Sequence, residues 1–228
     1  YAILSGLVGS EMCIRDRRRI ILLIEKQKEY KFLSSLNKRI MNDYIDLIVD
    51  ANKKFNLISK STEKNIWDRH IADSAQLLNH LPNGTKTICD VGSGAGFPGV
   101  VLKIINMSLN VTIVEPSKKK SEFLKFISKE RALDLNIVQE KYENIKKSQM
   151  PFFDVITARA LKPLDKLIHL FFEDLKQGSV CVFPKGENWQ KELDLAQTNW
   201  LLQYSVETSI TNKRSKILEF LSQNKESL

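Results

Sequence analysis

Short apolar runs alternate with amphipathic segments from residue 85 to residue 221. The runs have the length of strands, and the segments between them repeat apolar residues at helical spacing. The pattern predicts seven strands, at 87–91, 110–114, 135–139, 153–157, 179–183, 203–209 and 216–221. Helices are predicted between them, at 98–106, 117–131, 142–147, 163–176 and 187–197. Such alternation is typical of an α/β domain whose mostly parallel sheet carries helices on both faces.

The last two strands are joined by only a few residues, with polar Asn212-Lys213-Arg214 in the connection. Parallel neighbours need a long crossover, so we expect a hairpin and an antiparallel final strand.

Two of the predicted helices have residues at their ends that favour capping. Ser117 is a candidate N-cap, and Gly178 is a candidate C-cap.

The pattern before residue 85 is helical. From Arg18 to about Phe55 it predicts two or three helices, with breaks near residues 34–35 and 42–43, and a further helix runs from Thr62 to about Leu78. We expect residues 18–84 to form an N-terminal helical subdomain and residues 85–228 to form the main domain. Residues 1–17 begin without Met and lack sustained periodicity, so we expect a non-native or disordered extension there.

Composition narrows the class of partner. The chain has 228 residues, which suits one α/β domain with an appendage. Its 35 basic and 27 acidic residues give a net charge of +8, which suits a polyanion, nucleic acid first, although charge alone equally fits a basic surface. Cys13, Cys89 and Cys181 lie far apart, so we expect no disulfide framework, no metal site and a cytoplasmic location. No apolar run has the length of a membrane span, so we expect no membrane partner.

The strongest chemical signal is the stretch Asp90–Gly99, which reads DVGSGAGFPG between two apolar runs. This is a strand, a glycine-rich turn and the start of a helix. Glycine has no Cβ, so Gly92, Gly94 and Gly96 would let the backbone approach a nucleotide-like ligand closely. Asp90 would place a carboxylate beside that ligand, which suits a cationic cofactor such as S-adenosylmethionine better than a pyrophosphate. Phe97 would pack against either the ligand or the core.

A dinucleotide site is an alternative, because residues 94–99 formally match G-x-G-x-x-G and Glu115 lies about 20 residues further on. However, in a dinucleotide site the first glycine of the motif directly follows the strand. Here the match begins at Gly94, two residues after Gly92, which is the first glycine after the strand. Pro98 also removes a backbone N–H near the helix start, where an anion would need donors. The sequence therefore favours a methyl donor over a dinucleotide, and a turn without any ligand is the third interpretation.

Further candidates follow the other strands, at the sheet edge where ligands of open α/β domains bind. Glu115 could accept both ribose hydroxyls of a cofactor, or it could be a surface acid at a strand end. Tyr142 and Glu143 stand where adenine would be recognised. Arg159 suits a phosphate, a carboxylate or the O6/N7 edge of guanine. Lys185 could meet an RNA phosphate or be solvated.

One polar motif precedes the first predicted strand. It reads Arg69-His70-Ile71-Ala72-Asp73-Ser74. His70 and Asp73 are three residues apart and so share one face of a helix. They form either a local hydrogen-bonded pair that stabilises the helix or part of a site. No His, Asp and Ser set in the chain has the scaffold of a hydrolase nucleophile.

Taken together, these motifs resemble the bacterial small-subunit ribosomal RNA guanine-N7 methyltransferase G family, RsmG. The resemblance covers the chain from about residue 25 to its end, in the family's order and spacing. It is carried by residues 56–59, 69–74 and 90–99, by Arg159-Ala160 and by Lys185-Gly186. It implies a class I S-adenosylmethionine-dependent methyltransferase fold, Rossmann-like, with a seven-stranded sheet. It also implies N7 methylation of one guanine in 16S ribosomal RNA, although Tyr142 stands where the family often has Ala.

The resemblance and the residues together define an expected site. The cofactor-binding set is Asp90, Gly92, Gly94, Gly96, Phe97, Glu115, Tyr142, Glu143 and Arg159. Guanine N7 carries a lone pair and no proton, so the reaction needs no general base, and the catalytic role of Arg159 would be positioning. Arg69, His70 and Lys185 are the candidate RNA contacts.

The expected protein is a monomer that acts on 16S ribosomal RNA, either free or within a small-subunit particle. Three other functions are weighed against this one. They are a small-molecule methyltransferase with the same cofactor site, a dinucleotide oxidoreductase and a non-enzymatic RNA-binding module.

Overall fold

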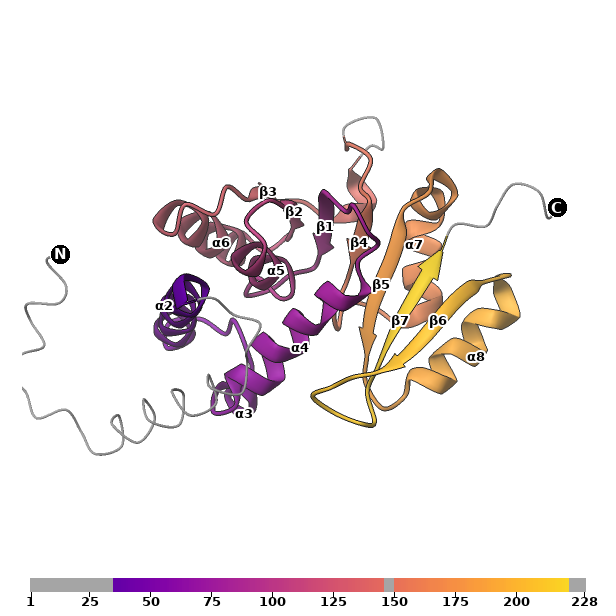
Figure 1. The fold of residues 1–228 in the computed structure, drawn as a ribbon, viewed down its shortest axis with the longest axis horizontal. Helices are drawn as coiled ribbons and strands as arrows, with labels where there is room; N and C mark the ends of the chain where they lie inside the picture. The colour runs from indigo at the N-terminus through magenta and orange to yellow at the C-terminus, as the bar shows by residue number, and fades with distance from the viewer. Residues whose placement is uncertain (1–34, 146–149, 222–228) are drawn as a thin grey trace, which may run out of the picture. The chain divides into compact units, whose positions relative to one another are not determined.

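The computed structural model describes residues 35–145 and 150–221 (Figure 1). The chain divides into two compact units, residues 1–38 and residues 39–228, and the sheet and cavity described below belong to the second. The predicted extension 1–17 and the helical pattern up to residue 34 lie outside the described residues. The domain boundaries expected at residues 17 and 84 therefore stay predictions.

The second unit is built on one seven-stranded sheet in the order β3-β2-β1-β4-β5-β7-β6. β7 runs antiparallel to both of its neighbours, and the pairs among β1 to β5 are parallel. This confirms the mostly parallel sheet and the antiparallel final strand. The strands are β1 (Thr87–Val91), β2 (Asn110–Val114), β3 (Asn136–Val138), β4 (Val155–Thr157), β5 (Val180–Lys185), β6 (Gln203–Thr208) and β7 (Lys216–Leu221).

The helices between the strands also lie where the pattern predicts them. They are α5 (Gly99–Ile105), α6 (Lys118–Glu130), the 3₁₀ turn η3 (Tyr142–Asn144), α7 (Leu164–Gln177) and α8 (Trp189–Asn199). Gly178 ends α7 in the left-handed region at φ 107°, which confirms the predicted C-cap. Ser117 holds the N-cap position of α6, but its side chain makes no capping hydrogen bond. The hydroxyl of Ser121 bonds the carbonyl of Glu115 instead, at 2.6 Å.

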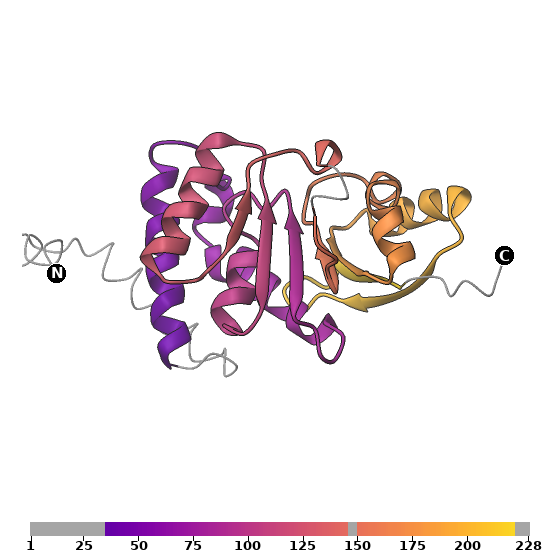
Figure 2. The same cartoon turned by 90° about the horizontal axis from the view of Figure 1, so that it is seen from above.

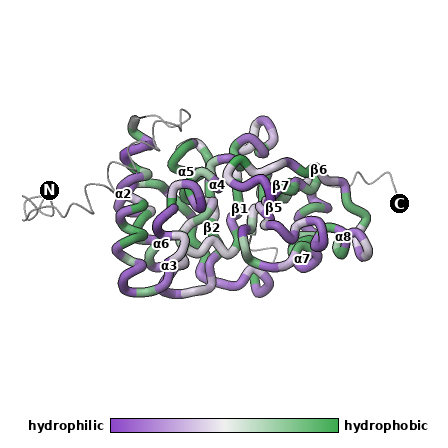
Figure 3. Tube along the Cα trace, turned by 90° about the horizontal axis from the view of Figure 1, so that it is seen from below, coloured by the Kyte–Doolittle hydropathy of each residue, from purple (hydrophilic) through white to green (hydrophobic). Residues whose placement is uncertain are grey.

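The N-terminal helical region differs from its prediction in two places. The break expected near residues 42–43 is wrong, because α2 (Ser35–Asn52) runs through it. Met41, Tyr44, Ile45 and Ile48 are all buried, and their helical spacing holds this stretch in one helix. Figure 3 shows hydrophobic and hydrophilic positions alternating along α2.

The predicted helix from Thr62 to Leu78 is instead a series of short turns. These are α3 (Lys60–Glu63), the π-helical turn η1 (Trp67–Ala72), α4 (Asp73–Ala75) and the 3₁₀ turn η2 (Gln76–His80). Within this series the hydroxyl of Ser74 donates to the carbonyl of His70 at 2.6 Å, and such a bond competes with the regular backbone ladder. π-Helical turns of this kind occur frequently at functional sites.

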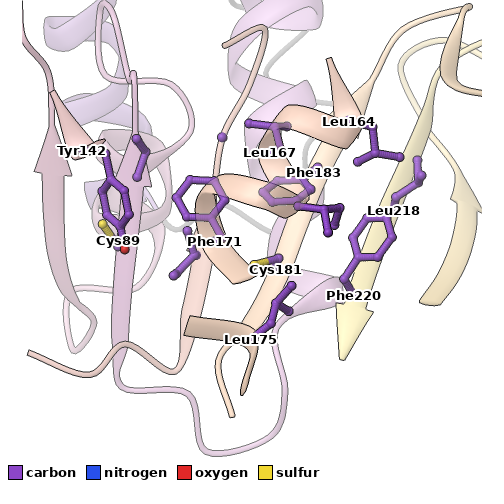
Figure 4. Packing of buried hydrophobic residues seen from close by; sticks show 14 of the residues in the cluster. Cys89, Tyr142, Leu164, Leu167, Phe171, Leu175, Cys181, Phe183, Leu218 and Phe220 are labelled. Carbon is purple, nitrogen blue, oxygen red and sulfur yellow. The ribbon is translucent and has the colours of Figure 1, made fainter. Parts of the chain in front are cut away.

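The sheet buries side chains on both faces. On one face, residues of α7 and α8 belong to a cluster that includes Cys89, Phe171 and Phe183. Figure 4 shows these three side chains within the cluster. On the other face α5 approaches so closely that a Cβ on Gly99 would lie 2.8 Å from a carboxylate oxygen of Asp90. Figure 2 shows the helices flanking the strands on both sides. Within the described residues, no helix combines the length and hydropathy that crossing a membrane requires.

The core makes a stability prediction. Phe171→Ala removes a fully buried ring from the cluster between α7 and the sheet, and the cavity left behind should lower the free energy of unfolding by about 3–5 kcal/mol. The matched control is Phe126→Ala on α6, where the ring is 48% exposed and the change should stay within about 0.5 kcal/mol. Urea unfolding of both variants measures the difference. Equal losses would contradict the described packing.

Candidate functional site

A cavity of about 720 Å³ lies beyond the carboxyl ends of β1, β4 and β5. Its volume suits a small-molecule ligand, and its place in the fold is the ligand-binding edge of an open α/β sheet. Four parts of the chain line it: the helical region, the glycine-rich turn, the segments after β4 and β5, and the β6–β7 turn. Among the predicted site residues, the lining contains Arg69, His70, Gly92, Gly94, Phe97, Arg159 and Lys185.

The glycine-rich turn, residues 92–96, needs glycine for two different reasons. Gly92, Gly94 and Gly96 all have positive φ, at 73°, 63° and 112°. A Cβ on Gly92 would lie 2.6 Å from the side chain of Leu161, and one on Gly96 would overlap Val100. A Cβ on Gly94 would meet nothing within 4 Å, because this residue faces the cavity. Gly94 is therefore where the backbone lies open to a ligand.

Asp90 lies behind the turn and outside the cavity lining. It is fully buried, and its Oδ2 accepts hydrogen bonds from the Ser93 hydroxyl and from the Gly99 backbone N–H, the latter at 2.8 Å. Burial raises the pKa of this carboxyl to about 6, although both hydrogen bonds act against the rise. Asp90 thus joins the glycine-rich turn to the start of α5. Its predicted contact with a cofactor stays a prediction.

Glu115 supports the same turn from β2. One carboxylate oxygen accepts from the backbone N–H of Gly94 at 2.9 Å, and the other accepts from that of Ser117 at 2.9 Å. The residue is buried, and it connects the glycine-rich turn to the start of α6. Glu115 is outside the cavity lining, and the ribose contact expected of it stays a prediction.

Tyr142 and Glu143 point in different directions. The Tyr142 ring is buried against Phe171, edge to face at 5.0 Å, and burial raises the pKa of its hydroxyl (Figure 4). Glu143 forms an ion pair with Lys162 at 2.8 Å, and that hydrogen bond lowers the pKa of its carboxyl. Only Lys162 of this pair is in the cavity lining. The adenine contacts expected at 142 and 143 stay predictions.

Arg159 is the centre of the site. One terminal nitrogen donates to His70 Nδ1 at 2.8 Å, and the other donates to Asp73 Oδ2 at 3.2 Å and to the Arg69 carbonyl at 3.1 Å. The guanidinium also lies 5.1 Å from the centroid of the Phe97 ring. Arg159 follows β4, whereas its three hydrogen-bond partners belong to η1 and α4. One side chain therefore joins the end of the sheet to the helical region.

His70 is a neutral partner of this arginine. Burial, followed by the charges of Arg159 and Arg69, lowers the pKa of its imidazole to about 3. Because arginine can only donate, Nδ1 accepts and Nε2 must carry the proton. That N–H donates to the hydroxyl of Thr62 at 2.9 Å, and the ring stacks on Phe97 with centroids 4.7 Å apart. His70 and Asp73 are brought together at the cavity because both bond Arg159, and the RNA contact expected of His70 stays a prediction.

Lys185 and Arg69, the remaining two predicted RNA contacts, differ in whether their charge is already paired. Lys185 is 8% exposed at its side chain, and its amine bonds the Glu192 carboxylate and the Lys162 carbonyl, both at 2.8 Å. Its charge is thus already paired at the cavity wall. Arg69 is exposed at the mouth, and no carboxylate within the described residues forms an ion pair with it. The phosphate contacts expected of both residues stay predictions.

Sequence reasoning missed the C-terminal wall of the cavity. Thr211, Asn212, Ser215 and Lys216 line it from the β6–β7 turn. The hydroxyl of Thr211 donates to Asp73 Oδ1 at 2.8 Å. The only available signal was a polar run at residues 211–215, which is ordinary for any hairpin connection.

The pKa of His70 makes a pH prediction. The unfolded chain binds a proton at His70 near pH 6.5 and the folded protein only near pH 3, so acidification favours unfolding between these values. Asp90 acts in the opposite direction, because folding raises its pKa from 3.8 to about 6. His70→Gln isolates the histidine. Between pH 6.5 and pH 5 the stability of the wild type should fall relative to this variant by up to about 1.4 kcal/mol per pH unit.

The control for this prediction is His169→Gln, which changes an exposed histidine on α7. Its stability should run parallel to that of the wild type across the same pH range. Chemical denaturation at several pH values measures all three proteins. A parallel course for His70→Gln as well would show that His70 is not held neutral.

Comparisons with known proteins agree on the family. The profile described as GidB, rRNA small subunit methyltransferase G, matches residues 37–221. Ribosomal RNA small subunit methyltransferase G from Rhodospirillum centenum is 35% identical over 175 residues, which cover 77% of this chain and 79% of that protein. The enzyme of the same name from Zymomonas mobilis is 38% identical over 171 residues, covering 72% of this chain and 76% of that protein.

Solved structures agree on the fold. An O-methyltransferase from Bacillus cereus in complex with SAH gives a TM-score of 0.55 at 13% identity and covers 78% of this chain and 90% of that one. A putative S-adenosyl-L-methionine-dependent methyltransferase from Methanococcus maripaludis gives 0.54 at 18% identity, covering 80% and 96%. These similarities show the class I methyltransferase fold. With a family match over residues 37–221 and relatives above 30% identity over most of its length, the chain belongs to the rRNA small subunit methyltransferase G family.

Proposed function

We propose that this protein transfers a methyl group from S-adenosylmethionine to N7 of a guanine in 16S ribosomal RNA. The observation that carries the proposal is the cavity itself, in a chain of this family. The open glycine-rich turn lines it, and so do Arg159 and its hydrogen-bond partners. The net charge of +8 supports a polyanionic substrate, and a ribosomal RNA substrate would place the reaction in the cytoplasm.

The residues present fit the methyl donor. Gly94 leaves open space on the side where a Cβ would project, and the cavity has room for a ligand of that size. Gly92 and Phe97 would contact the cofactor beside it. Asp90 and Gly96 would act by keeping the turn in shape, and Glu115, Tyr142 and Glu143 complete the proposed set. When bound, S-adenosylmethionine supplies the electrophilic methyl group.

The polar groups of the cavity suit a reaction that needs no base. Both ring nitrogens of His70 are engaged, by Arg159 and by Thr62, and its lowered pKa keeps the ring neutral. Asp73 is paired with Arg159 and bonded by Thr211. Guanine N7 has a lone pair ready to attack, so these groups are needed for positioning only. Correct orientation alone lowers such barriers by several kcal/mol.

Arg159 has the geometry to orient the reacting partners. Its guanidinium is held in place by hydrogen bonds to His70 and Asp73 and lies over Phe97. A guanidinium fixed in this way suits the O6 edge of guanine or the carboxylate of the cofactor. We infer that Arg159 is the catalytic positioning residue, with Arg69, His70 and Lys185 on the RNA side.

Mapping the methylated nucleotide tests the function. The purified protein is incubated with S-adenosylmethionine and either naked 16S ribosomal RNA, small-subunit particles or a panel of small-molecule acceptors. N7-methylation weakens the glycosidic bond, so borohydride and aniline treatment cleaves the RNA at that position. Cleavage at one guanine is the expected result. Methyl transfer to small molecules alone, or to another atom of RNA, would overturn the proposal.

Gly94→Ala tests the cofactor cradle. The added methyl group projects into the open cavity, so binding of S-adenosylmethionine should weaken at least tenfold while the protein stays folded. The backbone strain of alanine at positive φ should cost about 1–2 kcal/mol. Gly84→Ala is the matched control, because Gly84 also has positive φ (85°) and open space but does not line the cavity. Calorimetric titration of both variants decides, and equal cofactor affinities would remove Gly94 from the binding site.

Arg159→Ala and Arg159→Lys test the positioning residue. Alanine should reduce kcat/KM for RNA at least 100-fold, because the guanidinium that orients the reactants is lost. Lysine keeps the charge but cannot bond His70 and Asp73 with one planar group, so it should restore little activity. Single-turnover methylation is the measurement, with circular dichroism as the check on folding. Near-normal turnover in either variant would exclude the proposed role.

A further inference from the structure

The β6–β7 turn, residues 209–215, is a wall of the catalytic cavity as well as a hairpin connection. Thr211, Asn212 and Ser215 line the cavity opposite the glycine-rich turn. In Figure 1 this turn lies at the lower edge, on the same side as α4 and where the β5 arrow points. The methyl transfer proposed above does not by itself require this turn to do more than join two strands.

The turn is anchored to the helical region by side chains rather than by backbone pairing. Gln76 is buried, and its amide accepts from the Ile210 N–H at 2.9 Å and donates to the Ser209 hydroxyl at 3.1 Å. Asp73 accepts from the Thr211 hydroxyl at 2.8 Å. These bonds join residues more than 130 positions apart in the chain. A turn that only connected two strands would need none of them.

One carboxylate sets the spacing between the turn and Arg159. Asp73 accepts from Thr211 with Oδ1 and from Arg159 with Oδ2, at 2.8 Å and 3.2 Å. Any movement of the turn toward or away from the cavity must therefore stretch a bond to the residue that orients the reactants. The turn and Arg159 are thus linked through a single carboxylate.

The outer side of the turn is basic and open. Lys213 and Arg214 are exposed, and within the part of the chain that the structure describes no carboxylate forms an ion pair with Lys213. Arg214 lies 3.4 Å from Glu187, but both side chains are more than half exposed, so this pair contributes little. Ile210 beside them is 70% exposed. Among the described residues, an unpaired lysine beside an arginine whose only ion pair is exposed to solvent suits the phosphates of a nucleic acid.

We propose that the β6–β7 turn is an RNA-docking arm, in which Lys213 and Arg214 contact phosphates of the strand that flanks the target guanine. Asp73 and Gln76 hold this arm at a set distance from Arg159, so that phosphates bound outside place the guanine inside. The inference rests on the proposed function, because it takes the substrate to be RNA.

The test compares two double variants of the full-length protein. Lys213→Ala/Arg214→Ala removes the arm's charges, and Lys125→Ala/Lys129→Ala removes two exposed lysines from α6, which do not line the catalytic cavity. The arm variant should raise KM for 16S ribosomal RNA about tenfold with kcat within twofold. It should also reduce the slope of log K for RNA binding against log salt by about 1 to 2. S-Adenosylmethionine affinity should not change, and the α6 variant should change KM less than twofold.

Thr211→Val tests the anchor separately from the charge. It keeps Lys213 and Arg214 but removes the hydrogen bond to Asp73, so KM for RNA should rise several-fold while the salt slope stays that of the wild type. A merely weakened fold would instead lower S-adenosylmethionine affinity and RNA affinity together. Wild-type KM in this variant would overturn the anchoring role.

The outcomes separate this inference from the proposed function. If the wild type methylates the guanine but the arm variant matches the α6 variant in KM and salt slope, the docking role of the arm is wrong and the proposed function stands. Suppose instead that the wild type binds RNA without methylating it, and that only the arm variant shows lower RNA affinity and a smaller salt slope. The proposed reaction is then wrong and the docking role of the arm stands. If the wild type neither binds nor methylates RNA, both are wrong.

Discussion

The hydrogen bonds of the Arg159 guanidinium are the interaction on which the rest of the site depends. They reach His70, Asp73 and the Arg69 carbonyl, and so connect the end of β4 to the helical region. Other bonds, such as those of Gln76 to Ser209 and Ile210, also attach the helical region, but those of Arg159 cross the cavity itself. Because the second oxygen of Asp73 bonds Thr211, the same connection extends to the C-terminal hairpin. Three distant parts of the chain thereby share one cavity.

Buried carboxylates support the cavity from behind instead of lining it. Asp90 bonds Ser93 of the glycine-rich turn and Gly99 at the start of α5, and Glu115 bonds the middle of the turn at Gly94. Holding a charge-bearing group in the interior is costly, and the raised pKa of Asp90 reports that cost. The gain is a turn whose three glycines keep positive φ in a defined shape. A cofactor would then meet prearranged backbone, with little ordering still to be done.

The cavity contains many polar groups but offers no available base, and this agrees with the chemistry of guanine N7. His70 is neutral with both nitrogens engaged, and the Asp73 carboxylate accepts hydrogen bonds from Gln76, Thr211 and Arg159. An enzyme that had to remove a proton would need one of them free. The family membership indicates methyl transfer, and the engaged polar groups are consistent with it.

The amino-acid sequence alone was enough for the seven strands, the antiparallel last strand and the glycine-rich turn, because each depends on local periodicity or on glycine itself. It was also enough to single out Arg159, His70 and Asp73 as candidates. It could not reveal that Arg159 bonds both of the others, since those partners lie 86 and 89 residues away and meet only when the helical region packs on the sheet. The turns that replace a regular helix over residues 60–80, and the β6–β7 wall of the cavity, depend on packing for the same reason. A hydrogen bond between distant residues leaves no periodic trace in the chain, so folding alone determined which polar side chains meet.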